Sequence, residues 1–140
     1  MIYLDTSAAV PMFIPEPASD AIDAWYQSCA DVVVTSDWTL TEFASALSIK
    51  VRRGEISSKQ AQSAWKDFEA FCGAGLRTLP VSRKAFLVAA HMTRDVKGGL
   101  RSGDSLHLAI ALEVGAAGMA TADGTLEKNA KAMGLSVNRF

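Results

Sequence analysis

The sequence predicts an α/β fold in which a short, mainly parallel sheet is covered by helices on both faces. Short apolar runs, one of which is the β-branched run at 32–35, alternate with longer segments in which apolar residues recur at helical spacing. The runs are typical of strands buried on both faces, and the longer segments are typical of one-faced helices. Strands that alternate with helices indicate parallel crossover units. The chain has 140 residues and no linker or repeat, so we expect one domain over residues 1–140.

The first half of the chain is expected to contain two strands, a helical turn and three helices. They are a strand at 2–5, a turn at 7–13 broken by Pro11, a helix at 18–29, a strand at 32–35, and helices from Ser36 or Asp37 to about Arg53 and from Ser57 to about Gly73. The expected core stripe of the second helix is Leu40, Phe43, Ala44, Leu47 and Val51. Ser57 and Gln60 have the spacing of a capping box. The last two helices are joined by a short loop, which predicts an antiparallel hairpin.

The second half is expected to contain three more strands and three more helices. They are a strand at 76–81, a helix from Ser82 to about Asp95, a Gly-rich loop at 96–103, a helix at 104–114, a strand at 119–121, a helix at 124–133 and a strand at 135–138. Pro80 cannot donate a ladder hydrogen bond, which weakens its strand or places it at a sheet edge. The helix at 104–114 is apolar nearly all round, so we expect it to be central and buried.

Four acidic residues occupy strand ends and helix starts in this arrangement. Asp5 and Asp123 end apolar runs, whereas Glu42 and Asp104 lie near the beginnings of predicted helices. These positions meet at one edge of an open parallel sheet, where such folds bind ligands. Because the carboxylates would repel one another without cations between them, the pattern predicts a site for Mg²⁺, with Mn²⁺ as the alternative. Two such ions can activate a water and stabilise the leaving oxygen of a phosphodiester.

Small polar residues near these acids support the interpretation. Ser7 and Thr121 can hold a carboxylate or orient a ligand, and Arg101 can pair with an acid or contact a phosphate. Each acid also has a structural explanation by itself: Asp123 precedes Gly124 in a common turn pair, and the acids near helix starts complement helix dipoles. Their joint placement at one edge favours a common site.

Two further residues share helix faces with the acids. His107 lies three residues after Asp104, where a general-base role is conceivable. We favour a structural hydrogen bond for it, because a metal ion can generate hydroxide without a base. Trp38 lies four residues before Glu42, where stacking on RNA, core packing and partner contact are all open.

Four segments resemble the motifs of the PIN domain family. In chain order they are IYLDTSA at 2–8, TEFASAL at 41–47, LRSGDSLHLA at 100–109 and TAD at 121–123. The chain length and the early Pro-Glu-Pro at 15–17 are similar to VapC-type toxins of bacterial toxin–antitoxin pairs. The third motif is the most specific, and the resemblance covers nearly the whole chain.

The resemblance implies a PIN-like three-layer α/β/α sandwich with a helical hairpin. It also implies an endoribonuclease that depends on Mg²⁺ or Mn²⁺ and cleaves structured RNA of the tRNA or rRNA class. The catalytic, metal-binding acids would be Asp5, Glu42, Asp104 and Asp123. The implied partners are a VapB-type antitoxin that covers the groove and a second copy of the chain in a homodimer.

Other functions remain open from the residues alone. Phosphoryl transfer through an aspartyl-phosphate usually needs a second aspartate two residues after the first, where this chain has Ser7. A response-regulator receiver would need a lysine at the end of a late strand, and the nearest are Lys128 and Lys131, in the following helix. A non-catalytic module that binds a peptide or RNA belongs to a third class, against which the intact set of four acids argues.

Composition and charge indicate where the protein acts more than which reaction it catalyses. The formal net charge is −1, so no overall basic field marks a nucleic-acid binder. Asp5 interrupts the N-terminal apolar run, and the apolar stretch at 106–122 contains charged residues and glycines, so neither a signal peptide nor a membrane span is expected. We therefore expect a cytoplasmic protein in which Cys29 and Cys72 are buried free thiols.

Overall fold

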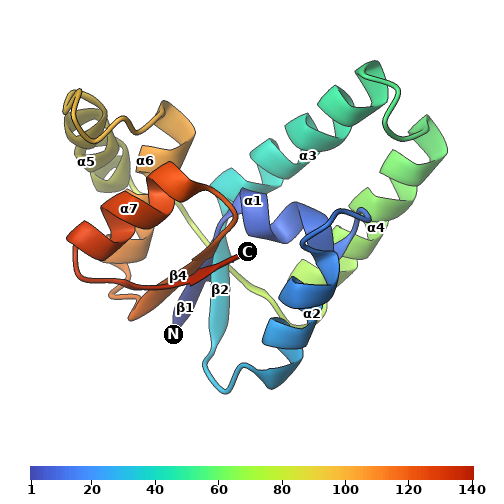
Figure 1. Ribbon diagram of the computed structural model, residues 1–140, viewed down its shortest axis with the longest axis horizontal. Helices are drawn as coiled ribbons and strands as arrows, with labels where there is room; N and C mark the ends of the chain where they lie inside the picture. The colour runs from blue at the N-terminus through green and yellow to red at the C-terminus, as the bar shows by residue number, and fades with distance from the viewer.

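A parallel sheet with strand order β3-β2-β1-β4-β5 runs through the centre of the molecule. The computed structural model describes residues 1–140 (Figure 1). The strands are β1 (Ile2–Leu4), β2 (Val33–Ser36), β3 (Arg77–Leu79), β4 (Gly118–Thr121) and β5 (Ser136–Arg139). Every strand pair is parallel, so the sheet is parallel throughout and not only mainly so.

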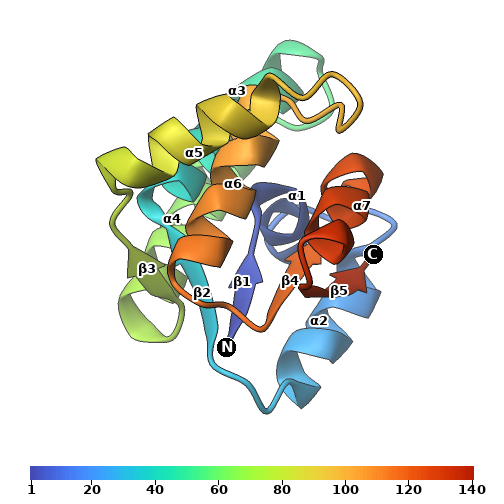
Figure 2. The same cartoon turned by 90° about the vertical axis from the view of Figure 1, so that its left-hand side faces the viewer.

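Helices cover both faces of this sheet. They are α1 (Thr6–Ala9), the 3-10 turn η1 (Val10–Met12), α2 (Ser19–Ser28), α3 (Asp37–Arg52), α4 (Ser58–Ala74), α5 (Arg83–Thr93), α6 (Ser102–Glu113) and α7 (Gly124–Ala132). Helices α5, α6 and α7 form one outer layer, and α1 to α4 form the other (Figures 1 and 2). The predicted three-layer α/β/α sandwich is confirmed.

Alternation along the strands divides the core into two clusters. Successive strand residues point to opposite faces. Tyr3 therefore packs with α5, α6 and α7, whereas Ile2 and Leu4 pack with the helices of the other layer. The same division separates Met119 from Ala120 in β4. The helix α6 is buried along most of its length, as its apolar sequence predicts.

Most predicted elements are present, with shifts at their ends. β2 begins at Val33, and Val32 before it is 62% exposed. β3 is short and lies at the sheet edge, as Pro80 predicts. α6 begins at Ser102, two residues earlier than expected, and β5 begins at Ser136. Such differences of one or two residues are ordinary at element ends, where hydrogen bonding fades.

The predicted hairpin of α3 and α4 extends beyond the sheet (Figure 1). The Ser57–Gln60 capping box is formed, and Gly54, with φ of 72°, lies in the connecting turn. The expected core stripe of α3 is only partly correct. Phe43 and Leu47 are buried, but Ala44 is exposed, because it lines an open groove between α3 and α4.

The remaining predictions concern cysteines and membranes. Cys29 and Cys72 are free thiols, as expected, but both are half-buried and not fully buried. None of the helices combines the length and the apolar character that crossing a lipid bilayer requires.

Candidate active site

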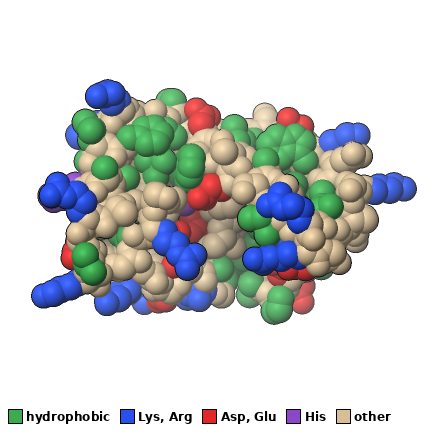
Figure 3. Space-filling view, turned by 90° about the horizontal axis from the view of Figure 1, so that it is seen from above, with side chains coloured by type: hydrophobic (Ala, Val, Ile, Leu, Met, Phe, Trp, Pro, Cys, Tyr) green, Lys and Arg blue, Asp and Glu red, His purple; other side chains and the backbone are tan.

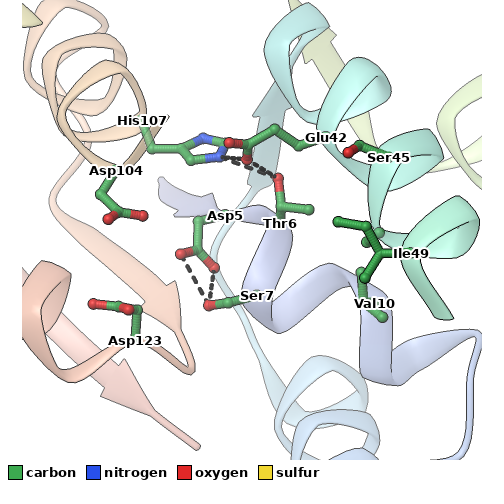
Figure 4. A pocket seen from close by; sticks show the side chains of 11 residues that line it. Asp5, Thr6, Ser7, Val10, Glu42, Ser45, Ile49, Asp104, His107 and Asp123 are labelled. Atoms are coloured by element: carbon green, nitrogen blue, oxygen red, sulfur yellow. Dashed lines mark hydrogen bonds and ion pairs between the residues drawn. The ribbon is translucent and has the colours of Figure 1, made fainter. Parts of the chain in front are cut away.

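The four predicted acids line one cavity at the carboxyl edge of the sheet (Figure 4). Asp5 directly follows β1 and Asp123 follows β4, whereas Glu42 lies in the second turn of α3 and Asp104 in the first turn of α6. The cavity has a volume of about 310 Å³. It is lined by Asp5, Thr6, Ser7, Val10, Glu42, Ser45, Ala46, Ile49, Asp104, His107 and Asp123. The parallel topology thus brings together residues from four separate segments.

Asp5 is the most deeply placed of the acids, with 2% of its surface exposed. Its carboxylate caps α1 by accepting from the Ala8 amide at 3.0 Å. It also accepts from Ser7 Oγ at 2.8 Å and from Thr121 Oγ1 at 2.7 Å. Burial raises the pKa of Asp5 above its usual value, against the charge of His107 and these hydrogen bonds, which lower it. The carboxylate is therefore fixed in orientation but costly to ionise.

Ser7 and Thr121 connect the ends of β1 and β4. Ser7 Oγ donates to Asp5 and accepts from the Ala122 amide at 2.7 Å. Thr121 Oγ1 donates to Asp5 Oδ2 and accepts from the Asp123 amide at 3.0 Å. Each hydroxyl thus satisfies one carboxylate and one backbone amide, which fixes the distance between the two strand ends.

Asp104 and Asp123 face Asp5 across the cavity (Figure 4). Asp123 caps α7 through a bond from the Leu126 amide to Oδ1 at 2.7 Å. Burial raises the pKa of Asp104, and the nearby carboxylates of Asp123 and Asp5 raise it further. No lysine, arginine or histidine side chain forms an ion pair with any of these three aspartates. We call Asp5, Asp104 and Asp123 the aspartate cluster.

Glu42 occupies a different environment from the aspartate cluster. Its Oε2 accepts from Thr6 Oγ1 at 2.6 Å and from His107 Nε2 at 2.7 Å. Burial by itself would raise the pKa of Glu42, but the hydrogen bond and charge of His107 and the bond from Thr6 lower it below its usual value. Glu42 is therefore held as an ionised carboxylate beside His107.

The arrangement fits a hard cation that takes only some of its ligands from the protein. The donors are carboxylate oxygens, which Mg²⁺ and Mn²⁺ prefer. No group of three or more His, Cys, Asp or Glu side chains is arranged to hold one ion by itself. Mg²⁺ keeps several waters and usually takes one or two protein carboxylates, so a closed cage is not required.

The structure places the other candidates less centrally. Arg101 is exposed, precedes α6, and forms no ion pair with a carboxylate. Trp38 packs against the core cluster of α5 to α7, and its buried Nε1 has no hydrogen-bond partner. Packing therefore describes Trp38 better than stacking on RNA.

Sequence reasoning missed Gly103. A Cβ added there would overlap Glu42 Oε1 and would lie 3.6 Å from Trp38 Nε1. Only glycine therefore leaves room for the Glu42 carboxylate against the start of α6. Its place directly before Asp104 was the available signal, but a glycine in a Gly-rich loop is equally typical of a turn.

Comparison with known proteins identifies the family. A family model described as PIN domain matches residues 2–132. The chain belongs to the PIN domain family. Ribonuclease VapC45 of Mycobacterium tuberculosis (strain CDC 1551 / Oshkosh) is 32% identical over 141 residues, which cover 98% of this PIN domain chain and 94% of that protein.

Solved structures agree on the PIN fold. The crystal structure of Mycobacterium tuberculosis VapC20, described as a Sarcin-Ricin loop cleaving toxin, matches with a TM-score of 0.74 and 18% identity over 92% of this chain and 95% of that one. VapBC2 from Rickettsia felis, bound to a DNA fragment from their promoter, matches with a TM-score of 0.65 and 18% identity over 100% of this chain and 99% of that one. At these identities the likeness establishes the fold alone.

Proposed function

We propose that this PIN domain is a metal-dependent endoribonuclease and the toxin of a VapBC-type toxin–antitoxin pair. The observation that carries the proposal is the aspartate cluster, which gathers three carboxylates in one cavity without a cationic side chain to balance them. In a chain 32% identical to a protein named Ribonuclease VapC45, that imbalance supports RNA hydrolysis assisted by a divalent cation. We further propose that residues 1–140 form a single domain.

The proposed cofactor is Mg²⁺, with Mn²⁺ as the alternative. The aspartate cluster would hold it, with Glu42 at the side of the cavity. Bound there, the ion supplies an activated water and positive charge for the leaving oxygen. Ser7 and Thr121 orient Asp5 by donating to its oxygens, and the backbone caps fix Asp5 and Asp123. These residues hold the carboxylates in place before substrate arrives, which reduces the reorganisation needed during the reaction.

RNA would enter from the open side above the carboxyl edge of the sheet. Figure 3 shows acidic side chains in the hollow between the two halves of the molecule, with Lys and Arg side chains on both sides of it. We propose that Arg101, exposed and three residues from Asp104, contacts a phosphate of the bound strand. The cation and these side chains together supply the positive charge that a net charge of −1 does not.

The proposed partners are a VapB-type antitoxin, an RNA substrate of the tRNA or rRNA class, and a second copy of the chain. The VapC and VapBC names of the similar proteins support the antitoxin and the RNA. Because those RNAs act in the cytoplasm, we expect the protein to act there too.

The structure weighs against phosphoryl transfer through an aspartyl-phosphate. Asp5 would be the nucleophile, but it is buried, and both of its oxygens accept hydrogen bonds from hydroxyls. A receiver domain would require a lysine at this site, and no lysine lines the cavity. A non-catalytic PIN-like binding module is left to experiment.

The test compares RNA cleavage by purified wild type, Asp104→Asn and Asp67→Asn. Asp67 is an exposed acid on α4 that does not line the cavity, and it serves as the matched control. Wild type and Asp67→Asn should cleave RNA with Mg²⁺ or Mn²⁺ and stop with chelator, whereas Asp104→Asn should be inactive. Cleavage by Asp104→Asn at the wild-type rate would refute the site, and RNA binding by wild type without cleavage would favour the binding module.

A further inference from the structure

A buried series of side chains leads from β2 to Glu42. Ser36 Oγ lies 2.7 Å from the Tyr3 hydroxyl, which lies 2.8 Å from His107 Nδ1. The opposite ring nitrogen, Nε2, lies 2.7 Å from Glu42 Oε2. Ser36 and Tyr3 are fully buried and His107 is 2% exposed, so water does not compete for these bonds. The function proposed above assigns no role to Ser36, Tyr3 or His107.

The chemistry of the groups fixes the direction of the donors. An ionised carboxylate only accepts, so His107 Nε2 carries a proton and donates to Glu42. When the ring carries this one proton, Nδ1 is an acceptor, and the Tyr3 hydroxyl donates to it. Burial raises the pKa of Tyr3, so its hydroxyl keeps its proton. Ser36 in turn donates to the Tyr3 oxygen, and all donors therefore point toward Glu42.

A second set of contacts prevents Glu42 from leaving this position. Thr6 Oγ1 donates to the same Oε2 at 2.6 Å and lies 3.1 Å from His107 Nε2. On the other side, Oε1 occupies the space where a Cβ of residue 103 would be, against the start of α6. Both oxygens are thus constrained, one by donors and one by the backbone of Gly103.

We propose that His107 is a positioning residue: its Nε2–H, supported by Tyr3 and Ser36, fixes the Glu42 carboxylate at the border of the aspartate cluster. The consequence for cation binding rests on the proposed function, but the placement of Glu42 does not. A side chain with three rotatable bonds would otherwise sample several positions. The series removes that freedom in advance, so that Glu42 presents one oxygen in a fixed place when the cation binds.

The first test reads the tautomer of His107 in the intact wild-type protein. Long-range ¹H–¹⁵N spectra distinguish a ring protonated at Nε2 alone from one protonated at Nδ1 alone and from one protonated at both nitrogens. The proposal requires the Nε2–H tautomer in wild type and in the exposed-residue control His91→Leu. A ring protonated at Nδ1 alone would overturn it, because Glu42 would then lose its donor.

The second test is a double-mutant cycle on cation affinity, measured by calorimetry with Mn²⁺. His107→Leu should weaken binding about tenfold in the wild-type background, the size typical of coupled neighbours, and much less in the Glu42→Gln background. His107→Gln, which keeps an N–H donor, should recover most of the loss. Thermal denaturation of each variant checks that it is folded, and the Gln variant keeps the test decisive if the Leu variant is not.

The outcomes separate this inference from the proposed function. An equal loss of affinity in both backgrounds, or no loss with His107→Leu, would overturn the positioning role. If wild type binds no Mn²⁺, the metal-dependent function fails, whereas the tautomer measurement still decides how Glu42 is held.

Discussion

The aspartate cluster should make the metal-free protein less stable than a variant that lacks one of its charges. Asp104 is the suitable position, because burial and the carboxylates of Asp123 and Asp5 raise its pKa. Its ionised form is therefore disfavoured in the folded state relative to the unfolded chain. Asp104→Asn keeps the shape of the side chain and removes the charge, so it should stabilise the metal-free fold.

The size of this effect follows from the half-buried setting. Water screens charges at a half-exposed site, where interactions between charged groups are typically worth up to about 1 kcal/mol. For a domain of this size, about 1 kcal/mol raises the melting temperature by roughly 3–5 °C. Mg²⁺ reverses the order of the two proteins, because it stabilises wild type. At about 100 times its Kd the stabilisation is about 2.7 kcal/mol.

The assay is thermal denaturation of wild type, Asp104→Asn and the control Asp67→Asn, each with chelator and with Mg²⁺. Asp104→Asn should melt above wild type in chelator and below it in saturating Mg²⁺, while Asp67→Asn follows wild type in both. If Asp104→Asn melts below wild type in chelator, the carboxylate is a structural partner and the reasoning from repulsion is wrong.

Three further predictions test the same site. The pKa values of Asp5 and Asp104 are raised in the folded state, so ionisation of these carboxylates opposes folding. Metal-free stability should therefore increase as the pH falls from neutral through those raised values toward the ordinary pKa of an aspartate. The lowered pKa of Glu42 has the opposite effect: the stability that its ionised carboxylate contributes should be lost as the pH falls below 4.5, the ordinary value for a glutamate. Denaturation curves across pH should therefore show a maximum of stability between neutral and acid conditions. A steady fall of stability from neutral pH downward would contradict the raised pKa values of the two aspartates. Thr121→Val removes the donor at 2.7 Å from Asp5 and should destabilise the protein by about 1.5–3 kcal/mol, as measured in urea, whereas an unchanged midpoint would show that Asp5 does not depend on this bond. Gly103→Ala should displace Glu42 and so lower RNA cleavage about tenfold or more. The free energy of unfolding should change by less than about 2 kcal/mol, because the helix propensity of alanine offsets part of the lost hydrogen bonding. Full activity of this variant would show that Glu42 can move without cost.

The gathering of the acids could be predicted from the sequence because it depends on topology. Asp5 and Asp123 end strands that lie side by side, and a parallel sheet places such ends at one edge. The order of strands and helices along the chain was therefore sufficient to predict most of the aspartate cluster. The three layers of the fold followed from the same alternation.

The division between Glu42 and the aspartate cluster could not be predicted. It depends on contacts across 36 residues to Thr6 and across 65 residues to His107. Sequence spacing places His107 near Asp104 on α6, but it does not reveal which acid the ring faces. The exposure of Ala44 was missed for a related reason, since helical periodicity does not indicate how closely a neighbouring helix packs along the stripe.

Asp5 directly follows β1, which is both the first element of the chain and the central strand of the sheet. This position affects when the site can form during synthesis. The hydroxyl that orients Asp5 belongs to Thr121, 116 residues later in the sequence. Pairing between β1 and β4 is correspondingly long-range, which is a slow kind of contact to form. A nascent chain on the ribosome therefore lacks an ordered aspartate cluster until nearly all of it has been made. If the chain acts as proposed, the ribosome that makes this nuclease is not exposed to its activity during synthesis.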